Sequence, residues 1–362
     1  MSRKQELAMQ TKRLDYLDFI KAVAICMVVF CHRVVIPDDS VAGAVCMVLV
    51  FSAVPCFMMC SGYVLLFKQE SAGKSFRRAG HVYLCMVVWK ALYFFFFQMF
   101  DTVEWNAVTL FRYLFLFCSL PGVDTENLWF LQAYIPALLV TPLLAPMFTQ
   151  RKFGMALAYT GLAYLSNQFV MSANLLLQLG SSRLHVELFD VEMLSHVFPL
   201  GGEYSSMLVC FLLGGVYRLL EERNLPQKRS FRIAAFFGMT LGLAIMMGVR
   251  YLQMGSFAWK SIPLVAKYEW SGTLLTSFCV FALLRPMGDG KLARWLGRNV
   301  GQCSMGVYYL HYLCLIPLSI YVYPLLPVSL WVNFAKTALV AAFCVLLTKA
   351  GKRIPLVREL MR

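Results

Sequence analysis

The 362-residue sequence has few charged side chains, and this scarcity excludes the class of ordinary soluble domains. Asp, Glu, Lys and Arg make up 14% of the residues, whereas 60% are hydrophobic and the mean hydropathy is +0.66. A soluble domain carries about 25% charged residues. No hydrophilic segment reaches the roughly 100 residues of an ordinary domain. We therefore expect a single integral membrane domain over residues 1–362.

Several chemical signatures are missing as well. The sequence contains no HExxH, no CxxC and no ladder of carboxylates, so it predicts no metal site. It also lacks a Walker A motif and a Rossmann glycine set, which argues against those nucleotide-binding folds. An inverted-repeat transporter would often show paired broken helices, and neither these nor an obvious internal repeat is evident here.

Long apolar runs, in contrast, are abundant. Ten of them approach the ~20 residues that a helix needs to cross a bilayer, which predicts an all-α polytopic protein with about ten transmembrane helices. The stretch 109–118 is apolar but short, which favours a re-entrant or interfacial segment. The predicted spans are 14–36, 43–67, 82–100, 128–147, 154–172, 204–221, 231–253, 268–285, 303–323 and 328–349.

The net charge of +14 does not indicate a nucleic-acid partner, because the basic residues are sorted by loop. Alternate loops are acidic, and the positive-inside rule then predicts both termini in the cytoplasm. The basic face suits anionic lipid of the bilayer or an anionic cytosolic substrate. Most Lys and Arg residues lie in the amino terminus, the loops 68–81, 148–153, 218–232 and 285–302, and the carboxyl tail.

The first predicted span carries Asp18, Lys21 and His32. Ionisable groups in a membrane helix are costly and usually face a protein interior or a cavity. Lys21 and His32 are eleven positions apart, about three helical turns, so they would share one face over about 16 Å. Asp18 could pair with Lys21, and His32 could act as a base and then an acid. Alternatively, Asp18 and Lys21 sit at the headgroups and His32 at the outer interface.

Three further segments could carry chemistry. Pro55 with Ser61, Gly62 and Tyr63 suggests a kink and a close backbone approach, although ordinary helix packing explains it too. Trp129 opens the fourth span, where aromatic residues usually form an interfacial belt.

The third segment runs from Ser304 through Tyr309 to His311, which would lie near mid-membrane. A histidine bonded to a neighbouring helix is the simpler alternative. Arg77 and Arg78 could bind phosphates or merely obey the positive-inside rule. The long outer loops 101–127 and 173–203, the second with His185 and His196, are candidate lids or acceptor-side surfaces, or solvated loops.

These segments occur in an order that resembles the membrane acyltransferase family three, which includes bacterial O-acetyltransferases of cell-surface polysaccharides. Leu17 to Ala22 followed by His32 is similar to the family's acidic residue, basic residue, ten-residue gap and histidine. Phe57 to Tyr63 is similar to its Ser-Gly segment. Two shorter matches are Trp129-Phe130-Leu131 and Tyr309-Leu310-His311.

The resemblance implies acyl transfer from cytosolic acyl-CoA to a hydroxyl, often on an extracytoplasmic sugar. His32 matches the essential histidine, and Lys21 matches a basic partner that is usually Arg. Lys offers a point charge rather than a bidentate fork, which suggests a different subgroup.

The hypothesis is a ten-helix membrane O-acyltransferase, with acetyl as the expected acyl group and no tightly bound cofactor. His32, Lys21 and Asp18 would be catalytic, with Asp18 holding Lys21. Acyl-CoA phosphates would bind some of Lys21, Arg77 and Arg78. Further candidates for substrate binding are Ser61, Tyr63, Trp129, Ser304, Tyr309 and His311.

Two other function classes stay open from the sequence. A transporter or flippase for a glycan or lipid precursor could use the same buried ions as a substrate or proton path. A sensory or docking membrane domain would catalyse no turnover. The sequence does not name the acceptor, and it leaves self-association into a homo-oligomer open.

Overall fold

A computed structural model describes residues 14–100, 103–185, 189–191, 193, 195, 204–259 and 268–361. Within these ranges the regular structure is helical, apart from one isolated bridge between Leu120 and Val123. The expected all-α class is therefore confirmed. The longer helices are α2 (Asp15–Cys31), α3 (Val41–Val50), α4 (Ala53–Leu65), α5 (Ala72–Gln98), α6 (Ala107–Phe115), α7 (Trp129–Thr149), α8 (Phe153–Tyr164), α9 (Val170–Leu184), α10 (Ser205–Glu222), α11 (Arg229–Met254), α12 (Ser271–Met287), α13 (Lys291–Asn299), α14 (Ser304–Tyr321), α15 (Leu330–Gly351) and α16 (Pro355–Leu360).

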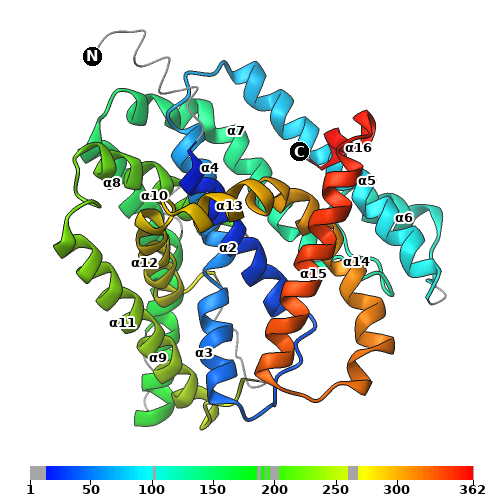
Figure 1. Ribbon diagram of the computed structural model, residues 1–362. Coiled ribbons are helices and arrows are strands. Elements are labelled where there is room, and N and C mark those ends of the chain that lie inside the picture. Colours follow the sequence, from blue (N-terminus) through cyan, green and yellow to red (C-terminus); the bar gives the residue numbers. More distant parts are fainter. Residues whose placement is uncertain are drawn as a thin grey trace.

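Helix α2 lies inside the bundle, where it contacts α3, α4, α12, α13, α14 and α15 (Figure 1). Its apolar residues Ile20, Ile25 and Val29 are completely buried against these neighbours. The helix ends at Cys31, and His32 already has extended backbone. The prediction of a helix over 14–36 is therefore wrong at its carboxyl end, for a reason that lies in α15 and is given below.

The second predicted span, 43–67, consists of two helices with a turn between them. Helix α3 ends at Val50, and α4 begins at Ala53. Pro55 has no N–H to bond the carbonyl of Phe51, so the helical ladder is interrupted there. The predicted kink is thus confirmed as a break between α3 and α4.

Helix α4 packs on α10 with their backbones in direct contact. A Cβ atom on Gly62 would overlap the carbonyl group of Phe211, and one on Gly214 would overlap that of Met59. Small residues of this kind let membrane helices approach closely. The close approach predicted for the Ser61-Gly62 segment is confirmed, and its partner is α10.

Six helical runs among the described residues are long and apolar enough to cross a membrane. Helix α2 has 17 residues, and α12 is apolar but equally short at 17 residues. The predicted count of ten spans and the cytoplasmic termini stay predictions. The six runs are Val41–Leu65, Ala72–Gln98, Trp129–Thr149, Arg229–Met254, Lys291–Tyr321 and Leu330–Gly351.

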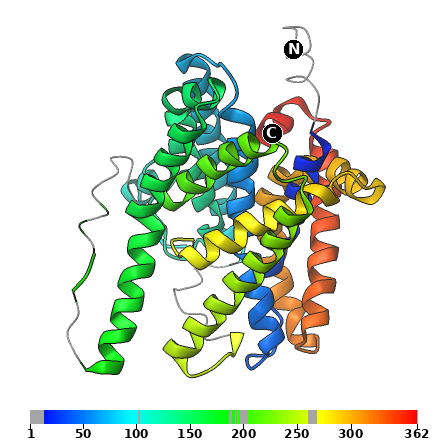
Figure 2. The same ribbon diagram turned by 90° about the vertical axis from the view of Figure 1, so that its left-hand side faces the viewer.

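The bundle has two chemically different ends. At the first, which we call the basic end, α2 begins while α4, α7, α10, α12 and α15 finish, and α13 lies across α2 (Figure 1). Ion pairs such as Arg298–Asp15 and Arg285–Glu221 join these termini. Helices α9 and α11 run towards the opposite end, as Figure 2 shows.

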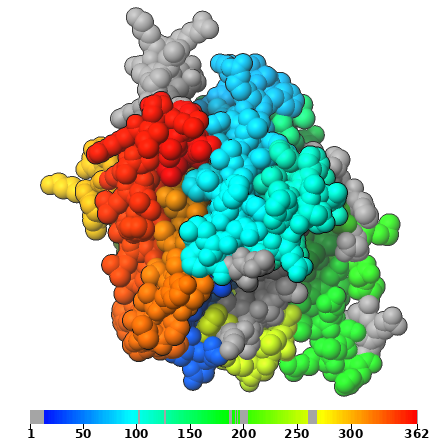
Figure 3. Space-filling view, turned by 90° about the vertical axis from the view of Figure 1, so that its right-hand side faces the viewer, coloured from blue at the N-terminus to red at the C-terminus, as the bar shows by residue number. Residues whose placement is uncertain are grey.

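Several predicted loops are partly helical. Helix α5 begins at Ala72, so Arg77 and Arg78 lie in a helix rather than in the predicted loop 68–81. Helix α6 covers part of the apolar stretch 109–118 and packs on α5, and Figure 3 shows the two on one face of the molecule. Helix α9 continues to Leu184, beyond the predicted loop start at 173, and His185 caps it with a positive φ of 52°. His196 lies outside the described residues.

Candidate active site

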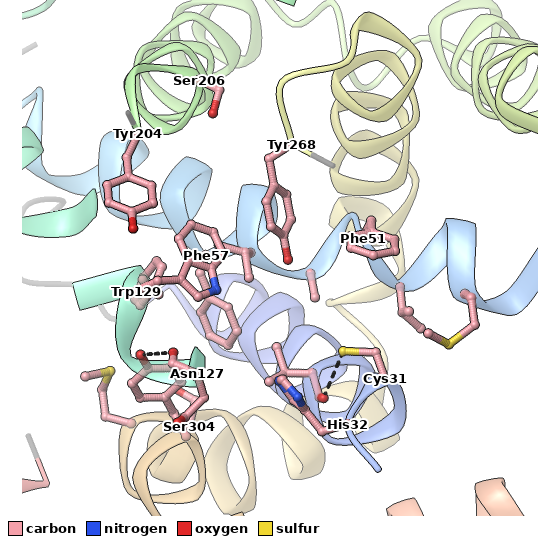
Figure 4. A pocket seen from close by; sticks show the side chains of 18 of the residues that line it. Cys31, His32, Phe51, Phe57, Asn127, Trp129, Tyr204, Ser206, Tyr268 and Ser304 are labelled. Atoms are coloured by element: carbon pink, nitrogen blue, oxygen red, sulfur yellow. Dashed lines mark hydrogen bonds between the residues drawn. The ribbon is translucent and has the colours of Figure 1, made fainter. Parts of the chain in front are cut away.

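A cavity of about 660 Å³, which we call the histidine cavity, adjoins the carboxyl end of α2. His32 lines it together with polar side chains from several other segments of the chain, among them Asn127, Trp129, Ser206, Glu269 and Ser304. Figure 4 shows most of these side chains around one space, with Phe57 and Tyr268 between them. Most of the remaining wall is apolar, from α2, α3 and α4. A few polar groups in an otherwise apolar cavity are typical of a small-molecule site.

A second imidazole lies beside His32. The ring centroids of His32 and His311 are 5.2 Å apart, and His311 is completely buried. The Nδ1 atom of His311 lies 3.1 Å from the carbonyl oxygen of Val307 and 2.8 Å from that of Tyr308. Carbonyl oxygens only accept hydrogen bonds, so Nδ1 carries the proton and Nε2 keeps a lone pair. That Nε2 atom is buried and has no hydrogen-bond partner among the described residues.

Helix α15 explains why α2 stops at Cys31. The ammonium group of Lys336, 5% exposed, donates to the carbonyl oxygens of Phe30 at 3.3 Å, His32 at 2.9 Å and Arg33 at 3.4 Å. Asn333 donates to the Phe30 carbonyl and accepts from the N–H of Val35. A cation is favourable at the negative end of a helix, where the last carbonyls lack intrahelical partners. These two side chains therefore hold the backbone of His32 in its extended conformation.

The loop between α6 and α7 is also tied to His32. Asp124 in this loop accepts hydrogen bonds from the hydroxyl of Tyr312 and, at 2.9 Å, from Arg33. The ring of Tyr312 meets the His32 ring edge-on, with 5.2 Å between centroids. The Asp124 carboxylate is thus connected to the histidine through one aromatic side chain.

Asn127 occupies the opposite wall of the cavity with a fixed orientation. Its side-chain amide donates to the hydroxyl of Tyr93 at 3.0 Å, and its backbone carbonyl accepts from Tyr308 at 2.5 Å. The Oδ1 atom is buried and has no hydrogen-bond partner in the part of the chain that the structure describes. An unpaired acceptor of this kind costs free energy unless a ligand satisfies it, so Asn127 is a candidate ligand contact.

The structure brings together four of the residues singled out from the sequence. His32, Trp129 and Ser304 line the histidine cavity, and His311 packs against His32. They come from α2, α7 and α14, which are far apart in the chain. Three motifs that are separated in the sequence are therefore close together in the folded protein.

Asp18 and Lys21 are not part of this cavity. Their carboxylate and ammonium groups are 3.7 Å apart, one turn apart on α2. The eleven positions from Lys21 to His32 correspond to about 16 Å at 1.5 Å per residue, which keeps the two groups in different layers of the bundle. The pairing of Asp18 with Lys21 is confirmed, but a shared site with His32 is not formed.

Three other candidates also point elsewhere. The Ser61 hydroxyl donates to the carbonyl of Phe57 within α4. The Tyr63 hydroxyl donates to Glu221 at 2.7 Å, in the ion cluster of the basic end. Tyr309 is buried and stacks on Trp89, with ring centroids 4.7 Å apart. Ser61, Tyr63 and Tyr309 thus support the helix packing around the cavity and do not line it.

Arg77 and Arg78 lie on the first turns of α5 at the basic end, where Arg78 is already paired with Glu70 at 2.9 Å. Burial raises the pKa of the Glu70 carboxyl, but the Arg78 hydrogen bond and charge, with Lys68 and Lys74, outweigh it and leave the pKa below its ordinary value. Glu70 is therefore a carboxylate at neutral pH that holds Arg78. A phosphate at this position would compete with Glu70 for the guanidinium group.

The sequence reasoning missed the residues that position the site. Lys336 lies inside the predicted span 328–349, and an ionisable residue within a span is itself a signal of function. Lys90, buried in α5, carries the same signal. Asn333 and Asp124 carry no such signal, because Asn is not ionisable and Asp is ordinary in loops.

Comparison with known proteins places this architecture in a family. A family model described as an acyltransferase domain matches residues 14–349, which include α2 to α15 almost entirely. The chain therefore belongs to this acyltransferase family, as its resemblance indicated. No curated protein sequence gives a match to the chain.

Proposed function

We propose that this membrane acyltransferase moves an acetyl group from cytosolic acetyl-CoA to a hydroxyl of a cell-surface glycan in a bacterial plasma membrane. The family match favours acyl transfer over the transporter and sensory interpretations. One observation carries the reaction type: His32 lines a cavity beside a second buried imidazole, with a ring separation of 5.2 Å. A titratable base at a cavity wall is what the activation of a hydroxyl requires.

In the proposed reaction, an imidazole nitrogen of His32 accepts the proton of the acceptor hydroxyl. The oxygen attacks the thioester carbonyl and forms a tetrahedral intermediate. The intermediate then collapses, the carbon–sulfur bond breaks, and His32 returns its proton to the departing thiolate of CoA. The products are the acetyl ester and CoA with a free thiol, so the proton taken from the hydroxyl ends on sulfur.

Other residues of the cavity have supporting roles in this proposal. The Nε2 lone pair of His311 can accept an N–H from His32 and stabilise the imidazolium that forms. The Ser304 hydroxyl can donate to the oxyanion of the tetrahedral intermediate. The apolar wall supplied by α2, α3 and α4 limits the access of water, which would otherwise hydrolyse the thioester.

The donor would enter from the basic end. Of the α14 residues that line the cavity, Ser304 comes first in the chain and is therefore nearest the basic end. Gly301, three positions earlier, packs on the backbone of Asp18. In this proposal Lys21, one turn beyond Asp18 on α2, donates to the CoA phosphates in addition to its pairing with Asp18. Its pairing with Asp18 limits the cost of keeping the ammonium inside the bundle.

The test is acetyl transfer by purified protein in nanodiscs. Acetyl-labelled acetyl-CoA is supplied with and without a mixed glycan extract, and both released CoA and label in the glycan are measured. Wild-type protein should release CoA in proportion to label incorporated, and His32→Ala should bind acetyl-CoA but incorporate none. Label incorporation by His32→Ala at the wild-type rate would overturn the role of His32. Movement of a glycan or lipid solute with the thioester left intact would support a transporter.

A further inference from the structure

A second cavity, of about 590 Å³, adjoins the histidine cavity and shares Trp129 and Tyr204 with it. We call it the loop cavity, because the loop between α6 and α7 forms much of its wall. We propose that the loop cavity is the acceptor subsite and that it binds a pyranose ring of the glycan. This inference rests on the proposed transfer to a hydroxyl and specifies where that hydroxyl is held.

The lining of the loop cavity differs from that of the other cavities. It is dense in groups that exchange hydrogen bonds with hydroxyls, including a carboxylate, an amide, an ammonium and two alcohols. A sugar ring presents several hydroxyls that both donate and accept, so it needs mixed partners of this kind. The polar side chains are Lys90, Ser119, Asp124, Thr125 and Gln132.

Trp129 is an aromatic side chain in the wall of both cavities. Its indole contacts Tyr204, with 5.6 Å between ring centroids and 28° between planes, and Tyr268, at 4.9 Å and 34°. The two tyrosines hold the indole at the boundary, where it can contact the apolar C–H groups of a sugar. Trp129 lies on the boundary of both cavities and can hold a sugar with one hydroxyl directed at His32.

The polar groups of the loop cavity are held in place. Lys90 is buried and donates to the carbonyl oxygens of Tyr113 at 2.7 Å and Cys118 at 3.3 Å, which ties the loop to α5. Gln132 accepts from the Tyr204 hydroxyl at 3.3 Å. Groups that are already oriented lose little entropy when a ligand binds.

Asp124 connects the two cavities. It lines the loop cavity and also accepts from Tyr312, whose ring packs edge-on against His32. A sugar bound near Asp124 is therefore separated from His32 by one aromatic side chain, that of Tyr312. The volume also agrees, because cavities of about 300–1,000 Å³ are typical of small-molecule sites.

An apolar groove of about 510 Å³, between α2, α3, α11, α12 and α15, provides the contrast. Its wall is almost entirely hydrocarbon and sulfur, from residues such as Val23, Met27 and Leu284. It offers little that could satisfy sugar hydroxyls, so it does not compete for the acceptor.

The test fills the loop cavity from its exposed side. Ser119→Trp introduces a large side chain at an exposed loop position that lines the loop cavity and not the histidine cavity. Ser182→Trp, at an exposed serine of α9 that lines neither cavity, is the matched control. Binding of a panel of methyl glycosides is measured by saturation-transfer NMR in nanodiscs, and the KM values for acceptor and acetyl-CoA are measured separately.

We expect Ser119→Trp to lose glycoside saturation transfer and to raise the acceptor KM by at least about tenfold, the equivalent of one or two hydrogen bonds. Its KM for acetyl-CoA and its melting temperature should match those of Ser182→Trp. A smaller rise, about fivefold, is expected for Gln132→Leu.

Two results would overturn the acceptor subsite: no glycoside binding by the wild-type protein, or an acceptor KM in Ser119→Trp equal to that of Ser182→Trp. A failure of the proposed function is distinguishable from these. In that case the wild-type protein would release no CoA with any acceptor, while glycoside binding would still be present and still be lost in Ser119→Trp.

Discussion

The two ends of helix α2 both carry ionisable side chains but differ in what surrounds them. At the basic end, Asp18 is paired with Lys21, and the Tyr16 hydroxyl donates to Glu221. Arg285 pairs with Glu221 at 2.7 Å and lies 3.9 Å above the Tyr16 ring. The charges there satisfy one another, which is the arrangement that stabilises a helix junction.

At the other end of α2, the polar groups around His32 are arranged for a ligand. The Lys336 ammonium donates to three backbone carbonyls. In contrast, the Nε2 atom of His311 and the Oδ1 atom of Asn127 have no hydrogen-bond partner among the described residues. A buried acceptor without a partner is expensive. The comparison indicates that buried polar atoms without a hydrogen-bond partner at a cavity identify a functional site better than charged residues within a helix do.

The largest expected effect distinguishes the two ends directly. His32→Ala should lower kcat for acetyl transfer by about 10²- to 10⁴-fold, the range for losing a general base. Lys21→Ala, at the other end of the same helix, should raise the KM for acetyl-CoA and leave kcat within a few-fold. Steady-state kinetics on both variants decide this. Equal losses of kcat would mean that the two ends act as one site.

Lys336→Met should have the next largest effect. The methionine fills similar space but donates nothing to the carbonyls of Phe30, His32 and Arg33. We expect a loss of about 1.5–3 kcal/mol in unfolding free energy and about a tenfold lower kcat with an unchanged KM for acetyl-CoA. Lys336→Arg should recover part of the kcat. Denaturation in detergent and kinetics measure both, and an unchanged kcat would remove Lys336 from the positioning of His32.

Glu221→Gln tests the basic end as a structural cluster. It leaves Arg285, whose side chain is 22% exposed, with the exposed Asp289 as its remaining carboxylate partner, and it weakens the hydrogen bonds from Tyr16 and Tyr63. We expect a loss of about 1–3 kcal/mol in unfolding free energy, with kcat per folded molecule unchanged. A loss of kcat at unchanged stability would show instead that this cluster takes part in turnover.

The smallest effect is expected for Arg298→Gln. Arg298 pairs with Asp15 at 3.1 Å, but its side chain is 62% exposed, and exposed ion pairs contribute about 0–1 kcal/mol. The melting temperature and kcat should both stay near their wild-type values. A drop comparable to that of Glu221→Gln would mean that the packing of α13 on α2 depends on this pair.

Helix placement was largely predictable, because long apolar runs carry their own signal. All ten predicted spans fall on helices of the structure, although among the described residues six runs meet the length and apolarity needed to cross a membrane. The errors lie at ends and breaks. α2 stops at Cys31 because Lys336 and Asn333 bond the carbonyl of Phe30 and the backbone just beyond the helix, and no local pattern around residue 31 indicates a side chain 305 positions away.

The candidate site was also predictable only in part. The sequence alone determined the class of the fold, the family and the choice of His32, because composition and motif spacing are local properties of the chain. Only the tertiary structure decided that His311 and Trp129 join His32, and that a loop with Asp124 supplies a second cavity. The physical reason is that cavities and hydrogen-bond partners are made between helices, and packing sets which faces meet.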